Sequence, residues 1–383
     1  MNSEAALVLE NARIILADRE IEAGSVVIDH GLITSITDGP NETKAKTLDL
    51  SGLTLLPGFI DVHIHGAVGV DTLDANAEQL GEVAKFLATQ GVTSWLPTLV
   101  PASDEQFSRA VGEIAKSMNR SSGARALGVH YEGPFVNAAQ CGALHKEYFK
   151  TYSSPADLTC VTSPDDAVRM ITLAPEISGG VELVRELKRR GWVISIGHTR
   201  ADLSTLDEAC DAGARHMTHF MNAMPQLHHR SPGPVAWGLL REDVTFDVIA
   251  DGIHLDPFVL RLLLKAKGVG GITLISDAIA AAGRGDGDYQ IWGETISVKN
   301  GRTANASGSI AGSVISMLDA VRLMRSLGVS YVDLARMAST NPARLLGVDH
   351  VCGSIEVGKR ADLVALDENG NVKLTMIDGH IVS

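Results

Sequence analysis

Two kinds of hydrophobic pattern divide the chain into a long middle and two similar ends. From residue 6 to about residue 52, short apolar and β-branched runs such as SVVIDHGLITSI alternate with turns, and residues 348–383 return to this pattern in ADLVALD and VKLTMIDGHIV. The pattern is typical of antiparallel strands. Neither end is long enough to bury a core alone. We therefore predict that residues 1–52 and 348–383 together build one small β-sandwich domain.

The middle, residues 53–347, alternates short apolar runs with amphipathic stretches, which is typical of βα units around a parallel sheet. Helices are predicted at residues 78–90, 103–118, 181–190, 202–212 and 256–267; Ser103 caps one start and Gly91 ends another. The apolar runs are LLPGFIDVHIH, TSWLPTL, ALGVHYEG, RMITLAPE, WVISIGH, ARHMTHF, TFDVIAD and ITLISDA. Eight strand–helix repeats predict an α/β fold, a (β/α)8 TIM barrel that forms the catalytic domain.

Two insertions interrupt the predicted barrel. The connection from residue 134 to residue 168 is long, and DYQIWGETISVKNGRT, which follows the eighth run, is typical of a hairpin. Both should lie at the C-terminal face of the strands, where the loops of this fold carry function.

Composition and charge narrow the classes of partner. The 383 residues include 33 Lys plus Arg and 46 Asp plus Glu, a net charge of −13 that repels nucleic acid and anionic membranes. No stretch approaches the ~18 apolar residues of a membrane span, and the N-terminus lacks a signal-peptide pattern. The cysteines lie far apart, as in a reducing compartment. We therefore expect a cytoplasmic protein that binds neither nucleic acid nor membrane.

Ionisable residues stand at the ends of five predicted barrel strands. They are His63, His65, Glu132, His198, His219 and Asp277. Any one of them alone would be an ordinary packed residue, and the H-x-H pair merely shares one face of a strand. Because the C-terminal ends of barrel strands meet at one face, we expect all six to converge. Imidazoles and carboxylates together predict a divalent metal site.

Several longer segments resemble the amidohydrolase superfamily and, within it, the N-acetylglucosamine-6-phosphate deacetylases. They are PGFIDVHIHGAVGVD, HYEGPF, SIGHT, THFMNAMPQLHHRSPG, DGIH, LISDA and SIAGS, and GSIEVGKRADLVALD resembles the superfamily's returning sandwich strand. The resemblance covers essentially the whole chain. It implies a metal-dependent enzyme of amino sugar metabolism, a homodimer, that converts N-acetyl-D-glucosamine 6-phosphate to D-glucosamine 6-phosphate and acetate.

The resemblance also implies a role for each ionisable residue. Glu132, His198 and His219 match the principal metal ligands, and the His63–His65 pair matches the ligands of a second ion where one is present. No lysine suitable for carbamylation follows the fourth strand, so Glu132 is the expected bridge. Zn²⁺ suits this ligand set, and Fe²⁺, Mn²⁺ or Co²⁺ could occupy it.

Asp277 matches the family's general acid/base. A bound cation lowers the pKa of its water towards ~7 and so supplies hydroxide for attack on the acetyl carbonyl. A carboxylate beside that water can accept its proton and return it to the departing amine.

Further residues match the family's substrate contacts. Arg230 and His254 match positions that bind the sugar phosphate, some of which reach in from a neighbouring subunit, and a guanidinium can hold a phosphate in a bidentate fork. The remaining matches are Asn222, Ala223, Ile310, Ala311 and Gly312.

One segment departs from the family pattern. Relatives often carry Gly-Ala-His or Gly-Thr-His after the third strand, whereas this chain has Gly142, Ala143, Leu144 and His145. We expect Ala143 and His145 to contact substrate, but whether Leu144 or His145 replaces the carbonyl-polarising histidine stays open, as does a role for Cys141.

Other functions remain possible at this point. A deacetylase of N-acetylgalactosamine 6-phosphate differs by one inverted hydroxyl, and a cyclic-amide hydrolase would usually have the missing lysine. In a different class, the barrel could be an inactive sugar-phosphate-binding protein. His130 and His216, which precede ligand positions, are expected to be structural.

Overall fold

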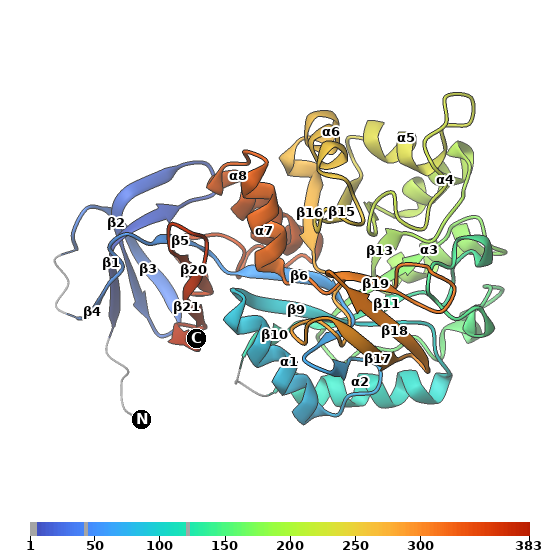
Figure 1. Cartoon of the computed structure of the whole chain (residues 1–383), viewed down its shortest axis with the longest axis horizontal. Coiled ribbons are helices and arrows are strands. Elements are labelled where there is room, and N and C mark those ends of the chain that lie inside the picture. Colours follow the sequence, from blue (N-terminus) through green and yellow to red (C-terminus); the bar gives the residue numbers. More distant parts are fainter. Residues whose placement is uncertain (1–5, 42–44, 120–122) are drawn as a thin grey trace.

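A computed structural model describes residues 6–41, 45–119 and 123–383. It has an eight-stranded β-sheet on one side and a barrel of parallel strands ringed by helices on the other, with the C-terminus at the sheet (Figure 1). The α/β class and the TIM barrel predicted from the sequence are confirmed.

Both ends of the chain join the eight-stranded sheet. Its order is β22-β21-β20-β5-β1-β2-β3, and β4 pairs with β1. The strands are β1 (Leu7–Ile15), β2 (Glu20–Asp29), β3 (Leu32–Asp38), β4 (Lys46–Asp49), β5 (Thr54–Pro57), β20 (Leu363–Leu366), β21 (Val372–Ile377) and β22 (His380–Ile381). Leu9 and Val26 from one end pack in one buried core with Leu363 and Met376 from the other. Each end thus supplies apolar surface that the other needs.

The first predicted barrel run, LLPGFIDVHIH, consists of two strands. Its beginning is β5, which pairs with β1 and β20 in the eight-stranded sheet, and only β6 (Phe59–Ile64) lies in the barrel. Gly58 separates them, and a Cβ at this position would lie 2.1 Å from the Thr93 side chain. The chain therefore passes from one sheet to the other through a gap that only glycine fits.

The barrel has the eight predicted strands in parallel. After β6 they are β9 (Val92–Leu99), β11 (Gly128–Glu132), β12 (Val168–Leu173), β13 (Val193–Ile196), β14 (His216–Met217), β15 (Thr245–Ile249) and β16 (Ile272–Ile275), and the short β10 (Arg125–Ala126) pairs with β9. Where β16 meets β6, the Ser276 hydroxyl donates to buried Asp61 at 2.5 Å and the Asp277 N–H donates to the His63 carbonyl at 3.0 Å. These hydrogen bonds hold His63 and Asp277 close together where β16 meets β6.

The predicted helices are confirmed to within one or two residues. They are α1 (Ala77–Thr89), α2 (Asp104–Met118), α3 (Gly180–Arg189), α4 (Leu203–Ala212) and α6 (Pro257–Lys267). Ser103 caps α2 as predicted, with its side chain accepting from the Gln106 N–H. Helices not predicted are α5 (Gly233–Leu240), α7 (Met317–Ser326), α8 (Tyr331–Ala335) and α9 (Asn341–Leu345), with a π-helical turn at Arg336–Thr340.

Both predicted insertions are present. The connection between β11 and β12 contains 3-10 turns at Ala138–Gln140, Lys146–Tyr148 and Pro155–Leu158. The predicted hairpin extends to a three-stranded sheet of β17 (Gly287–Ile291), β18 (Glu294–Lys299) and β19 (Arg302–Ala304). A smaller ribbon of β7 (Gly66–Ala67) and β8 (Val70–Asp71) directly follows β6.

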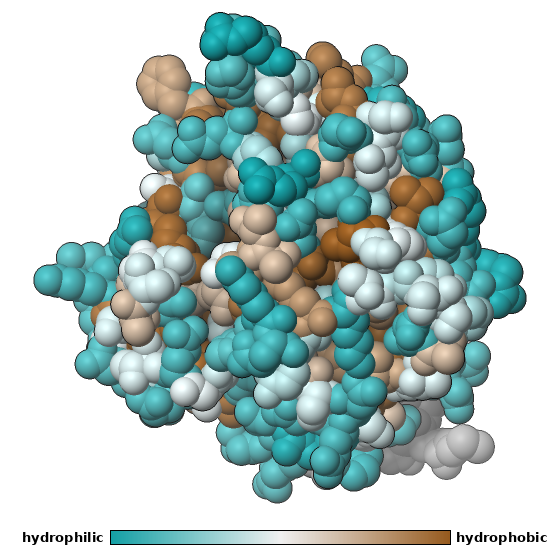
Figure 2. Space-filling view, turned by 90° about the vertical axis from the view of Figure 1, so that its right-hand side faces the viewer, coloured by the Kyte–Doolittle hydropathy of each residue, from teal (hydrophilic) through white to brown (hydrophobic). Residues whose placement is uncertain are grey.

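The surface is mainly hydrophilic on the end of the barrel that faces away from the eight-stranded sheet, where apolar residues form separate patches (Figure 2). Across the described residues, each helix is too short or too polar to cross a bilayer.

Candidate metal centre and active site

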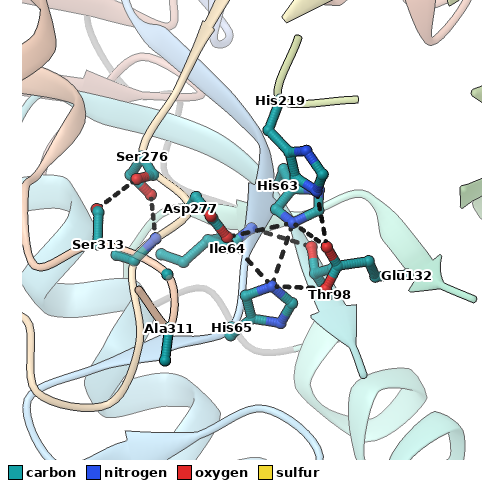
Figure 3. A network of polar contacts seen from close by, with 12 residues as sticks. His63, Ile64, His65, Thr98, Glu132, His219, Ser276, Asp277, Ala311 and Ser313 are labelled. Carbon is teal, nitrogen blue, oxygen red and sulfur yellow. Dashed lines mark hydrogen bonds and ion pairs between the residues drawn. The ribbon is translucent and has the colours of Figure 1, made fainter. Parts of the chain in front are cut away.

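The structure brings together the six ionisable side chains predicted from the strand ends. They lie at the C-terminal ends of β6, β11, β13, β14 and β16, and each is at most 7% exposed. His63 and His65 share one face of their strand because side chains alternate along it. Figure 3 shows His63, His65, Glu132, His219 and Asp277 pointing toward one another.

Glu132 occupies the middle of this cluster. Its Oε1 lies 2.8 Å from His198 Nε2 and 2.9 Å from His219 Nε2. Its Oε2 lies 3.3 Å from His65 Nε2. One carboxylate thus faces histidines from both sides of the barrel mouth, which is the arrangement a bridging ligand needs.

Asp277 faces the histidine pair of β6. Its Oδ1 lies 3.3 Å from the Nε2 atoms of both His63 and His65, which are themselves 3.1 Å apart. The ligand-type atoms fall into two groups that share His63 and lie within 4.8 Å of one another in each: His63 with Glu132 and His219, and His63 with His65 and Asp277. The cluster therefore offers two overlapping sets of ligand atoms that could hold a metal ion.

The charges of the cluster also suit a cation. Burial alone would raise the pKa of Glu132, but hydrogen bonds from His198, His219 and His65 outweigh it and hold the pKa well below its ordinary value. Burial likewise opposes ionisation of Asp277, and His63 and His65 lower its pKa below the ordinary value. Both carboxylates are thus anionic and require positive charge between them.

The histidines supply the positive charge that the two carboxylates require. Burial lowers the pKa of His65, but Asp277 and Glu132 raise it to about 10, and Glu132 similarly raises the pKa of His219 to about 9 against the effect of burial. A divalent cation would supply the same positive charge to neutral imidazoles whose Nε2 atoms already face one another. The residues present therefore fit a divalent metal ion.

Backbone contacts orient two of these ligands. His198 Nδ1 donates to the Gln140 carbonyl at 2.8 Å, which directs the Nε2 lone pair into the cluster. The backbone N–H of His219 donates to Oδ1 of the Asp247 carboxylate. The other oxygen of this carboxylate, Oδ2, lies 3.0 Å from His216 Nε2. The first contact holds the His198 imidazole in the orientation that coordination requires, and the second fixes the backbone from which the His219 side chain projects.

Three of the six residues have left-handed backbones. The φ angles are 48° at His198, 31° at His219 and 50° at Asp277. Non-glycine residues rarely adopt this conformation, and such strain gathers at functional sites. At each position the strand ends in a sharp turn that directs the side chain into the barrel mouth.

The two histidines predicted to be structural are buried, and both ring nitrogens of each have a partner. His130 lies 2.8 Å from both the Val62 carbonyl and Thr172 Oγ1. His216 contacts Thr245 Oγ1 and Asp247. Neither ring has a nitrogen left for a metal.

A cavity of about 320 Å³ opens in front of the cluster. Among its lining residues are six of the predicted substrate contacts: Ala143, Asn222, Ala223, His254, Ile310 and Gly312. His254 Nδ1 lies 2.7 Å from Asp251 Oδ2, which fixes the ring. The cavity is at the lower end of the size range of small-molecule sites.

Three predicted contacts lie elsewhere in this single chain. His145 Nδ1 faces Glu147 at 3.1 Å, and Leu144 is the residue of that pair that lines the cavity. Ala311 is buried behind its loop, where its N–H donates to Thr303. Arg230 is on an exposed loop and donates to His229 at 2.7 Å.

Sequence reasoning missed several residues at the site. Trp292, from the turn between β17 and β18, lines the cavity and packs edge-on against His65 with ring centroids 5.4 Å apart. Gly142 also lines the cavity, and Asp247 contacts His219 from behind. No local pattern marks these residues, because only the folded insertions and neighbouring strands bring them to the metal ligands.

This fold and site define a class: a hydrolase barrel that carries a metal centre at the C-terminal ends of its strands. The chain matches the amidohydrolase family over residues 54–382. It is 37% identical over 384 residues to N-acetylglucosamine-6-phosphate deacetylase of Bacillus subtilis (strain 168), an alignment that covers 98% of this chain and 97% of that protein. It is 36% identical to N-acetylgalactosamine-6-phosphate deacetylase of Escherichia coli O157:H7, with coverage of 98% and 99%.

A solved structure agrees with these sequences. The chain superposes with a TM-score of 0.91 and 30% identity on a mutant N-acetyl-D-glucosamine-6-phosphate deacetylase from Mycobacterium smegmatis in complex with N-acetyl-D-glucosamine-6-phosphate, covering 99% of this chain and 100% of that chain. The chain belongs to the amidohydrolase family, among its deacetylases of N-acetyl amino sugar 6-phosphates.

Proposed function

We propose that the chain is an N-acetylglucosamine-6-phosphate deacetylase, which hydrolyses N-acetyl-D-glucosamine 6-phosphate to D-glucosamine 6-phosphate and acetate. The observation that carries this proposal is the buried cluster of four histidines and two carboxylates beside a small cavity. It occurs in a chain that resembles the Bacillus subtilis deacetylase over nearly its whole length.

The metal we propose is Zn²⁺, as one ion or as two that would share Glu132 as a ligand; Fe²⁺, Mn²⁺ and Co²⁺ are the alternatives. Neutral imidazoles and carboxylate oxygens are ligands that all four ions accept. When bound, such a cation lowers the pKa of water and polarises a carbonyl oxygen.

Asp277 is the proposed general acid/base. It lines the cavity, and the histidines beside it keep its pKa low, so it is ionised and able to accept a proton from the attacking water. The amine leaves only after it gains a proton, because an amide anion is a very poor leaving group. Asp277 would return the proton it accepted to that nitrogen.

The cavity walls would orient the sugar. Asn222, Ala223 and His254 line one part of the cavity, and the loop containing Ile310 and Gly312 lines another. Ala143 and His145 stay proposed contacts in the third-strand loop, as does Ala311 in the last loop. Leu144 and Trp292 add apolar surface that suits the acetyl group and excludes water.

We propose that two copies form a homodimer and that Arg230 of one subunit binds the phosphate in the cavity of the other. The Arg230 loop is exposed and lies outside the cavity of its own chain. Apolar side chains are exposed on this loop and on the packed helices α5 and α6: Leu227 (52%), Leu240 (81%), Phe258 (78%) and Leu262 (53%). A second subunit would cover such a face.

Phe258→Glu is expected to convert this homodimer to a monomer. The substitution replaces an exposed phenyl ring with a carboxylate, and burial of this charge at an apolar interface is unfavourable. Light scattering after size exclusion measures the mass directly. Glu105→Gln, an exposed change on α2, is the control and should leave the mass unaltered. A variant that keeps twice the chain mass would place the interface elsewhere.

Arg230→Ala is expected to raise KM for N-acetylglucosamine 6-phosphate about 10- to 100-fold, the loss of a charge-assisted phosphate contact. kcat/KM for unphosphorylated N-acetylglucosamine should be unchanged. Steady-state kinetics on both substrates checks this, with Arg185→Ala on exposed α3 as the control. An equal loss on both substrates would exclude a phosphate role.

A panel of substrates tests the proposed function. The Zn²⁺-loaded protein is assayed for acetate release from the 6-phosphates of N-acetylglucosamine, N-acetylgalactosamine and N-acetylmannosamine and from the free sugars. We expect the highest kcat/KM for N-acetylglucosamine 6-phosphate. The relative from Escherichia coli O157:H7 supports N-acetylgalactosamine 6-phosphate as the second candidate. Metal-loaded protein that releases no acetate from any of them would indicate a binding protein.

We also propose that residues 1–52 with 348–383 form a β-sandwich domain beside the catalytic barrel of residues 53–347, and that the enzyme is cytoplasmic. Shared core packing of both chain ends supports the first proposal, although β5 extends the sheet to Pro57. The four cysteines, which are free thiols in the structure, suit the second.

A further inference from the structure

Three buried polar atoms without a hydrogen-bond partner lie around the metal ligand His65. They are His65 Nδ1, Asp71 Oδ2 and Trp292 Nε1. An unpartnered buried polar atom is uncommon and calls for an explanation. Among the described residues, Asp71 Oδ2 is the only carboxylate oxygen that is buried and has no hydrogen-bond partner.

The fold places the three side chains next to one another. Asp71 pairs with Gly66 across the β7–β8 ribbon, and the Thr72 N–H donates to the His65 carbonyl at 2.8 Å. The Trp292 ring stands edge-on to the His65 ring at 5.4 Å and 85°. Burial raises the pKa of Asp71 to about 6, and the nearby His65 and Trp292 act against that rise.

Local bonds already aim the Asp71 carboxylate. Its Oδ1 accepts the Leu73 N–H at 2.9 Å, which leaves Oδ2 available. Trp292 stands in a tight turn with φ of 53°, and its indole packs edge-on against the His65 ring. A hydrogen bond thus orients the Asp71 carboxylate, and ring packing orients the Trp292 indole.

Coordination chemistry shows what the arrangement can do. A histidine that coordinates through Nε2 carries its proton on Nδ1, and a carboxylate that accepts this proton's hydrogen bond orients the ring and strengthens the ligand. His198 has the Gln140 carbonyl in this role. His65 Nδ1, like the Nδ1 atoms of His63 and His219, has no such partner, and the Asp71 carboxylate is near enough to His65 to feel its charge.

We propose that Asp71 is a positioning residue for the ion held by His63 and His65: Oδ2 accepts the His65 Nδ1–H, and the Trp292 N–H donates to the same carboxylate. The β17–β19 insertion thereby contributes to the metal centre through Trp292. This inference rests on the proposed metal-dependent function, but it concerns metal affinity and not the identity of the substrate.

Asp71→Asn tests the proposal because it keeps an oxygen for the Leu73 N–H and replaces Oδ2 with a donor that faces the His65 N–H. Metal-free protein is titrated with Zn²⁺ against a competing chelator. We expect the first equivalent to bind as in the wild type and the second to bind about 10- to 100-fold more weakly. Asp74→Asn, an exposed change in the same turn, is the matched control.

Tryptophan fluorescence provides a second readout. Binding of the second equivalent should change the emission of the wild type, and Trp292→Phe should lose that change while it keeps an aromatic ring beside His65. Two results would overturn the proposal: an Asp71→Asn variant with wild-type affinity for the second equivalent, or a wild type that binds one equivalent only. An inactive wild type that binds both ions with this pattern would instead reject the proposed function and leave the Asp71 assignment standing.

Discussion

Asp277→Asn is expected to lower kcat by about 10²- to 10⁴-fold, the usual contribution of a positioned general acid/base. The metal content should stay near that of the wild type, because asparagine keeps an oxygen toward His63 and His65. The variant loses the group that can accept a proton and return it to the departing amine. Steady-state acetate release together with elemental analysis of the purified protein measures both quantities.

The effect should fall on kcat more than on KM because the Asp277 backbone is fixed independently of its charge. Its N–H donates to the His63 carbonyl at 3.0 Å, and its carbonyl accepts the Ser313 N–H at 2.7 Å. Asparagine can take the same position with the same bonds. Asp211→Asn on the exposed face of α4 is the control. Unchanged turnover in Asp277→Asn would mean that another group transfers the proton.

The barrel and the convergence of its ionisable residues could be predicted because both follow from short-range patterns. Parallel strands in a closed barrel present all their C-terminal ends at one face, so a residue that ends a strand has its location fixed in advance. Glu132 and Asp277 meet the four histidines for this reason. Helix limits were predictable from caps, as the Ser103 bond to the Gln106 N–H illustrates.

The loops around the cluster could not be predicted in the same way. In an irregular segment no periodicity decides which of two adjacent side chains points inward, and Leu144 lines the cavity where His145 was expected to contact substrate. Trp292 and Asp71 come from separate hairpins that meet only in the folded chain. The missed helix α5 is apolar on nearly all sides and opens with glycine and proline, so it lacks an amphipathic period.

Glu132→Gln is expected to remove both metal ions and to reduce acetate release to the background of the assay. Glu132 is the group that contacts histidines of both halves of the cluster, with Oε1 near His198 and His219 and Oε2 near His65. Glutamine deletes the negative charge that a buried cation requires and presents an N–H₂ donor to one of these imidazoles.

Comparison variants make the bridging role of Glu132 testable. Glu176→Gln changes a carboxylate just beyond β12 that binds Thr199 and the Arg200 N–H outside the cluster, and it should retain the wild-type metal content. Replacing His63 and His65 together with alanine should remove one ion and spare the other. The ratio of metal to protein therefore separates two cases. Loss of both ions only in Glu132→Gln supports the bridge, whereas full retention of metal in that variant would show that the histidines hold their ions without a shared carboxylate.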